Sequence, residues 1–215
     1  MQNALAVTWE TVRDWWSGMV GLATLNLLWL GLCLTVILGP PATAGMYAVT
    51  NSIAHGKGHH IGDFVEAARR YGWLSLRWAL ANLLVGVALA VSFVFYGAVE
   101  GSIAFLIQVG LACAGALWIT VQFYVWPFLI EQEQKHLRIA LRNALLLTLA
   151  NPLYTLVLLI VAGLVIAFSL VAILPLGVFT LSFLSLLGNR AVIERLAAYG
   201  KLPSAGRPPV SGEES

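Results

Sequence analysis

Long apolar stretches, separated by short polar or proline-containing breaks, dominate the hydrophobic pattern of this chain. A helix needs about 20 apolar residues to cross the hydrocarbon core of a bilayer, which is about 30 Å thick. Four stretches approach or exceed this length, namely residues 19–38, 73–96, 103–130 and 143–173. The pattern therefore predicts membrane-spanning helices, and the Asn151-Pro152 step predicts a kink in the last of them.

Two shorter apolar segments, 42–56 and 178–187, each follow a proline-containing break. Proline ends a helix because it lacks an N–H and clashes with the preceding turn, but it is tolerated in the first turn of the next helix. A helix over 42–56 is only about 22 Å long at 1.5 Å per residue, so it either spans thin membrane or is re-entrant. We expect three helical hairpins with corners at Pro40, 97–101 and Pro175.

Amphipathic segments precede the hairpins and mix aromatic and apolar residues with charged ones: 4–16, 61–71 and 131–142. Such segments are typical of helices that lie at the membrane surface. The predicted fold is an all-α polytopic membrane bundle of about five to six spans, arranged as three hairpins plus interfacial helices. Residues 1–202 form one transmembrane domain, and the Pro-, Gly- and Ser-rich residues 203–215 are expected to be a disordered cytoplasmic tail.

Composition supports the membrane assignment. The 215 residues are 60% hydrophobic and 10% charged, with a mean hydropathy of +0.85, whereas soluble domains carry about 25% charged residues. The net charge of +2 is too small to indicate nucleic-acid binding. Cys33 and Cys113 lie in apolar runs without disulfide or zinc spacing, so we interpret them as packing residues.

The placement of charge predicts the topology. Lys and Arg are retained on the cytoplasmic side of membrane proteins, and every basic residue lies outside the three corners, whose single charged residue is Glu100. Both termini are therefore expected in the cytoplasm. Four arginines form a predicted cytoplasmic basic belt: Arg69, Arg70, Arg138 and Arg142. We expect the belt to contact anionic lipid headgroups, with docking of a protein partner as the alternative.

A threefold repeat supplies the main candidate site. Arg13, Arg69 and Arg138 are each followed thirteen residues later by an asparagine, giving the set Asn26, Asn82 and Asn151. Buried amides need hydrogen-bond partners, so the set either joins helices or lines a polar solute site. Gln108 and Gln122 are candidate members of the same polar cluster.

We expect neither enzymatic activity nor a cofactor. Glu100 has no carboxylate partner in a shaped pocket, and nucleophile-elbow and P-loop motifs are not found in the sequence. His55, His59, His60 and Asp63 carry metal-ligating groups. Their glycine-rich surroundings and Lys57 favour a solvated loop over a metal site.

Two segments near the N-terminus carry a family resemblance. Asn26-Leu-Leu-Trp29, followed by Gly39, Pro40, Pro41 and Thr43 in a helix-break motif, resembles the N-terminal signature of the YesL family, a domain of unknown function in bacterial membrane proteins. The paired basic residues between Phe64 and Trp73 also resemble that family. The double proline departs from it, since family members more often carry a single proline.

The resemblance implies a setting rather than a mechanism. Family members are often encoded near sugar-uptake ABC transporters, which implies a bacterial plasma-membrane protein with an accessory role beside an ABC-type permease. The resemblance supplies no catalytic residues. Two hypotheses remain open: a non-enzymatic accessory or scaffold protein, and a small channel or carrier for a neutral solute that uses an Asn-lined site between the hairpins.

Overall fold

The computed structural model describes residues 4–58, 60–172 and 174–200, and these residues form helices joined by short connections. This confirms the predicted all-α class. The predicted tail at 203–215 and His59 lie outside the described residues. The helices are α1 (Ala4–Ser17), α2 (Met19–Cys33), α3 (Gly39–Ala54), α4 (Ile61–Arg70), α5 (Gly72–Gly97), α6 (Ser102–Glu131), α7 (Leu137–Ala150), α8 (Pro152–Ala172), α9 (Leu174–Val178) and α10 (Thr180–Ala198).

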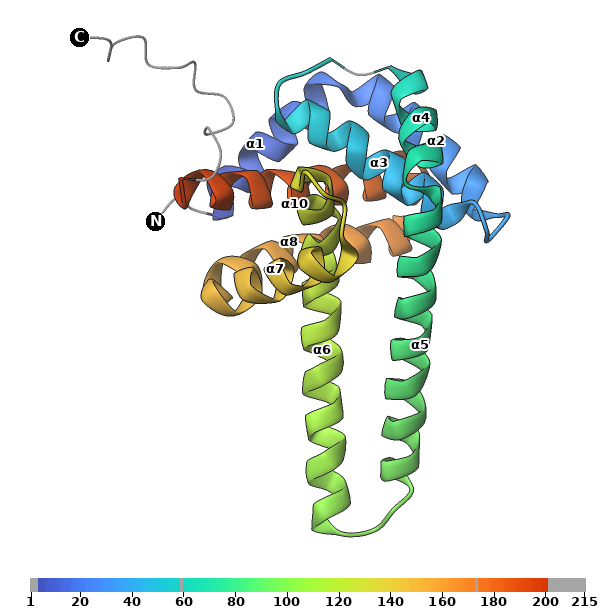
Figure 1. Ribbon diagram of the computed structural model, residues 1–215, viewed down its shortest axis with the longest axis vertical. Helices are drawn as coiled ribbons and strands as arrows, with labels where there is room; N and C mark the ends of the chain where they lie inside the picture. Colours follow the sequence, from blue (N-terminus) through green and yellow to red (C-terminus); the bar gives the residue numbers. More distant parts are fainter. Residues whose placement is uncertain (1–3, 59, 173, 201–215) are drawn as a thin grey trace, which may run out of the picture.

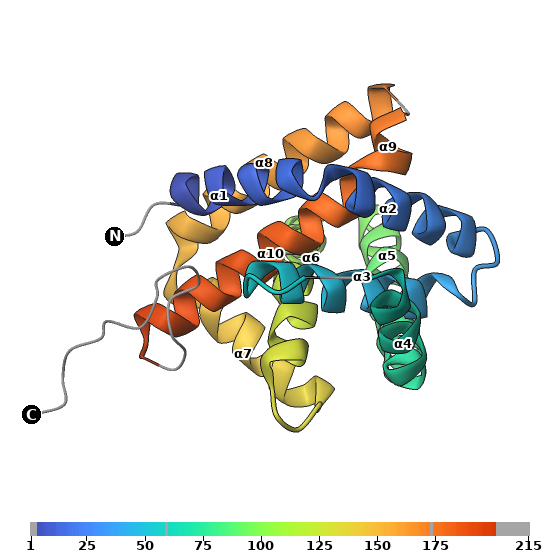
Figure 2. The same ribbon diagram turned by 90° about the horizontal axis from the view of Figure 1, so that it is seen from above.

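The molecule consists of a long helical hairpin and a head at one end of it. Helices α5 and α6 run side by side along the long axis and are joined far from the head (Figure 1). Viewed along this axis, α1, α2, α3, α7, α8 and α10 form a layer that lies crosswise to the hairpin (Figure 2). The described start of α1 and end of α10 lie on the same side of the head. The fully buried large side chains belong mostly to this head, for example Leu186, and to the C-terminal end of α6 that packs into it, for example Trp126.

The structure has fewer helices able to span a membrane than the five to six predicted. Among the described residues, α5, α6 and α8 are long and apolar enough, and α1 with α2 adds a fourth if this pair, bent by 90°, counts as one broken span. Helices α2 and α3 have 15 and 16 residues, or about 22 and 24 Å, which is shorter than the hydrocarbon core. Helix α10 is not one of the candidate spans, and it carries three charged residues, Arg190, Glu194 and Arg195.

The predicted hairpin partners do pack against each other, but the hairpins do not run in one direction. Helix α8 lies crosswise to α5 and α6 (Figure 2). We predicted one kinked helix at Asn151-Pro152, but the structure has two separate helices there. Helix α7 ends at Ala150, α8 begins at Pro152, and the chain changes direction between them (Figure 2). The first corner comes earlier than predicted: α2 ends at Cys33, and both prolines lie in the first turn of α3.

The residues of the family motif hold α2, α3 and α4 together. The Trp29 indole donates a hydrogen bond to the Thr43 hydroxyl (2.9 Å), which in turn donates to the Gly39 carbonyl (3.0 Å). On α3, Gly45 is buried against α4, and a Cβ at this glycine would lie 2.8 Å from the carbonyl oxygen of Phe64. Phe64 is the buried residue of α4, so α4 docks onto the head through this contact.

Polar contacts join the N-terminal helix to α10. Arg190 lies 3.1 Å from Glu10 and forms a second ion pair with Asp14. The buried indole of Trp15 donates to the Ser182 hydroxyl (3.0 Å). Asn26 of α2 accepts from the Ser182 N–H (2.9 Å) and donates to the Gly177 carbonyl (2.7 Å), so its side chain caps the first turn of α10.

Two reciprocal hydrogen bonds join α5 to α6. The Trp78 indole donates to Gln122 (2.9 Å), and the Trp118 indole donates to Asn82 (3.1 Å). Each helix therefore supplies one tryptophan donor and one amide acceptor, spaced one turn apart on the same face. The outer surfaces of both helices are apolar and exposed, as expected for a hairpin surrounded by lipid.

We expect Trp118→Phe to weaken the hairpin by about 0.6 kcal/mol, the average for an interhelical hydrogen bond in a membrane. Phenylalanine keeps an aromatic ring at position 118, but it has no N–H to donate to the Asn82 side chain. Unfolding by increasing SDS in mixed micelles measures the change. Trp73→Phe is the matched control, because Trp73 is 75% exposed. Equal effects of the two substitutions would contradict a role for the reciprocal bonds.

Candidate functional site

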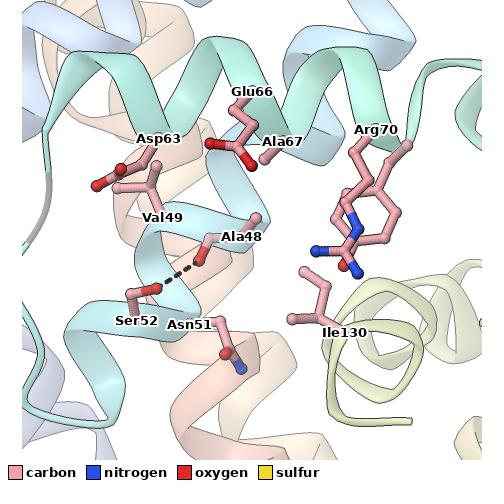
Figure 3. A pocket seen from close by; sticks show the side chains of 10 residues that line it. Ala48, Val49, Asn51, Ser52, Asp63, Glu66, Ala67, Arg70 and Ile130 are labelled. Carbon is pink, nitrogen blue, oxygen red and sulfur yellow. Dashed lines mark hydrogen bonds between the residues drawn. The ribbon is translucent and has the colours of Figure 1, made fainter. Parts of the chain in front are cut away.

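A polar cavity of about 310 Å³ opens in the head between α3, α4 and the C-terminal end of α6 (Figure 3). We call it the α3–α4 cavity. Three ionisable side chains of α4 line it, and α3 contributes an amide and a hydroxyl. Its lining is Ala48, Val49, Asn51, Ser52, Asp63, Glu66, Ala67, Arg70, Tyr71 and Ile130.

Helix α4 places its charged side chains at this cavity because its apolar side packs against the head. Phe64 is buried against α3, so Glu66 and Arg70 remain exposed. Asp63 accepts a hydrogen bond from the backbone N–H of His60 (2.8 Å) as part of a capping box at the helix start. The guanidinium of Arg70 also lies 5.8 Å from the centre of the Tyr71 ring.

A second group of charges lies where α6 ends. Asn51 donates to Glu131, and His55 lies 3.7 Å from the same carboxylate. The Lys135 ammonium donates to the carbonyl oxygens of Ile130 (2.6 Å) and Gln132, at the C-terminal end of α6. Burial lowers the pKa of Lys135, the nearby Arg70 lowers it further, and Glu131 acts in the opposite direction. The region thus combines cationic and anionic groups and suits a polar partner that carries both signs of charge.

The three predicted asparagines do not come together. Asn26 bridges α2 to α9 and α10. Asn82 lies between α5 and α6, where it also donates to the Trp78 carbonyl (2.9 Å). Asn151 donates to the Tyr199 hydroxyl (3.0 Å) beyond the end of α7. Because these are three separate helix contacts, the residues cannot together line one solute site.

The two predicted glutamines lie on α6 and contact α5. Gln122 belongs to the reciprocal pair with Trp78. Gln108 lies further along the hairpin and makes a long contact of 3.4 Å with the Phe93 carbonyl. Both therefore lie within the hairpin and outside the lining of the α3–α4 cavity.

The four arginines of the predicted basic belt are all exposed and come from α4 and α7. Arg70 is the member that lines the α3–α4 cavity. Sequence reasoning missed Lys135 and Glu131 as neighbours of Arg70, because these residues are more than sixty positions apart in the chain. It also missed Arg190 and Arg195, whose side chains are partly buried in the head. No local motif distinguishes them.

These features define the class of protein. An all-helical chain with three helices able to cross a bilayer, and a fourth if the bent pair is included, is a polytopic helical membrane protein. Residues 22–96 match the family model described as protein of unknown function, DUF624, which confirms the resemblance to the YesL family over that range. No curated protein and no solved structure matches the chain significantly. The matched range covers α2 to α5, including the Trp29–Thr43 contact and the α4 side of the cavity.

Proposed function

We propose that this protein is a non-enzymatic accessory component of the bacterial plasma membrane that packs beside the permease of a carbohydrate ABC-type uptake system. The separation of charge between hairpin and head supports this proposal most directly. Between Trp78 and Val121 the sequence has one charged residue, Glu100, at the tip of the α5–α6 hairpin. The belt arginines and the charged α3–α4 cavity belong to the head.

In this proposal the hairpin crosses the membrane, and the head lies at the cytoplasmic face with the exposed apolar side of α8 against lipid and both termini in the cytoplasm. The positive-inside rule supports that orientation, because the basic residues belong to the head end of the hairpin and the tip has none. Reporter fusions at residue 1, at residue 215 and between Val99 and Glu100 test it. Opposite locations of the two terminal reporters would contradict the orientation.

The α3–α4 cavity is the docking site in this proposal, because it presents Arg70, Asp63 and Glu66 at its surface. The neighbouring Glu131 and Lys135 already serve structural contacts with Asn51 and the end of α6. Because these two charged groups are held in structural contacts, they are less suited to proton transfer to a substrate. A surface with fixed charges suits recognition of a protein partner.

We expect Arg70→Glu to reduce recovery of a permease subunit by roughly tenfold, because a reversed charge at an interface costs more than the original contact gains. Affinity purification of tagged protein from native membranes, with quantitative mass spectrometry, measures recovery. Arg69→Glu is the matched control, because it makes the same charge change on the same helix outside the cavity. Repeated recovery of the wild-type protein without a permease subunit would contradict the proposed function.

A further inference from the structure

A second cavity, of about 190 Å³, lies on the other side of the head, between the end of α6, helix α7 and the last turns of α10. We call it the α7–α10 cavity. Neither the asparagine set nor the basic belt contributes to its lining. The lining residues are Phe128, Asn143, Leu146, Leu147, Ala150, Arg195, Leu196 and Tyr199.

Arg195 is the cation that lines this cavity. Among the described residues, no carboxylate oxygen lies within 4.0 Å of its guanidinium, although the three ion pairs found elsewhere include Arg190 on the same helix. The guanidinium instead lies 3.7 Å from the centre of the Tyr154 ring, which fixes its position. Its Nε is buried without a hydrogen-bond partner in the described part of the chain.

Two further donors belong to the same cavity. Asn143 lines it, and its amide makes no hydrogen bond to the described residues. The Tyr199 hydroxyl accepts from Asn151 (3.0 Å), which leaves its own O–H free to donate. The cavity therefore combines a fixed guanidinium, an amide N–H₂ and a phenol O–H.

The rest of the wall is apolar. Leu147 and Phe128 are buried, whereas Leu146 is 56% exposed. On the same helix, Leu149 is 60% exposed, while Arg138 and Arg142 carry charge. An exposed face of this kind is typical of helices at a membrane surface. The cavity thus carries one cation, Arg195, in a lining that is mostly apolar.

From this geometry we infer that the α7–α10 cavity binds a phosphate-type anion, with Arg195 as the charged ligand and Asn143 and Tyr199 as additional donors. A planar guanidinium donates two parallel hydrogen bonds to such an oxyanion and stays charged at all physiological pH values. An anion would also compensate a partly buried charge that has no acidic partner among the described residues. The apolar wall favours a phosphate carried by an anionic phospholipid, and free phosphate is the other source of the same chemistry.

Native mass spectrometry of the full-length protein, released from detergent with phosphatidylglycerol or phosphatidylcholine, tests the inference. Inorganic phosphate, followed by the shift in thermal unfolding, is the second probe. We expect preferential retention of phosphatidylglycerol and roughly tenfold weaker retention by Arg195→Gln, which loses a charge-assisted hydrogen bond. Arg13→Gln removes the same charge from α1, outside both the cavity and the basic belt, and should retain lipid like the wild type.

Ala150→Leu adds a larger side chain to the cavity wall and keeps Arg195. It therefore tests anion binding independently if Arg195→Gln fails to fold. We expect it to weaken retention as well. A thermal shift with phosphate alone, lost in both cavity variants, identifies a small anion as the source. Equal retention of the two lipids by the wild type without a phosphate effect, or unchanged binding in the folded cavity variants, overturns the inference.

Discussion

Gly45→Val is expected to detach α4 from the head. Even the first added carbon would lie 2.8 Å from the Phe64 carbonyl oxygen and 3.1 Å from its ring, and backbone at that distance has to move. Overpacking of this kind costs about 1 to 3 kcal/mol. In a chain of this size that lowers the unfolding midpoint by roughly 2 to 4 °C per kcal/mol. Circular dichroism during heating in detergent measures it.

The same substitution should open the α3–α4 cavity, because Asp63, Glu66 and Arg70 are positioned by the docking of α4. In a chain with Cys33 and Cys113 replaced by serine, Ala67→Cys then reports the change through faster labelling with a maleimide, because Ala67 lines the cavity and is partly buried. Gly62→Ala is the control, since Gly62 lies on α4, the other helix of this contact, and has no atom within 4 Å of an added Cβ. It should leave stability unchanged or raise it slightly. Equal losses from both substitutions would show that the Gly45–Phe64 contact is not the cause.

The second large effect is expected from Asn26→Leu, at about 2 to 6 kcal/mol, because it leaves two buried polar groups without their partner at about 1 to 3 kcal/mol each. The groups are the Ser182 N–H in the first turn of α10 and the Gly177 carbonyl. Asn26 is fully buried, so water cannot replace the amide. Loss of folded protein during SDS titration measures the effect.

Asn82→Leu is the control for this prediction, because both asparagines occupy equivalent positions in the threefold repeat. Asn82 is half-buried between α5 and α6, and its loss removes one contact to Trp118 and one to its own helix. We expect a cost near 0.6 kcal/mol per interhelical bond. If the two substitutions were equally harmful, the capping role of Asn26 would be refuted.

Both predictions concern contacts of the family-matched range, and they explain its motif physically. Asn26 caps α10, Trp29 binds Thr43, and Gly39 is buried against Cys33. The motif therefore builds the head in which the α3–α4 cavity opens. A head assembled around α3 and a separate apolar hairpin are the features on which the proposed accessory role rests.

The sequence by itself determined the helices and the membrane class. The apolar stretches at 73–96 and 103–130 became α5 and α6 nearly to the residue, and the charged face at 61–71 became α4. These features are local, because a helix satisfies its backbone hydrogen bonds within a few residues and the pattern of side chains records its environment. The family motif could likewise be recognised from the sequence, because its residues lie close together in the chain.

Only the tertiary structure decided the direction of α8, the separate roles of Asn26, Asn82 and Asn151, and the two cavities of the head. The three asparagines look alike in sequence, but their partners are 151, 36 and 48 residues away. Arg195 became distinctive because folding placed it over Tyr154, with no ion pair to a carboxylate of the described residues. Contacts between distant segments follow from how whole helices pack, and the periodicity of one helix carries no information about which partner its polar side chains meet.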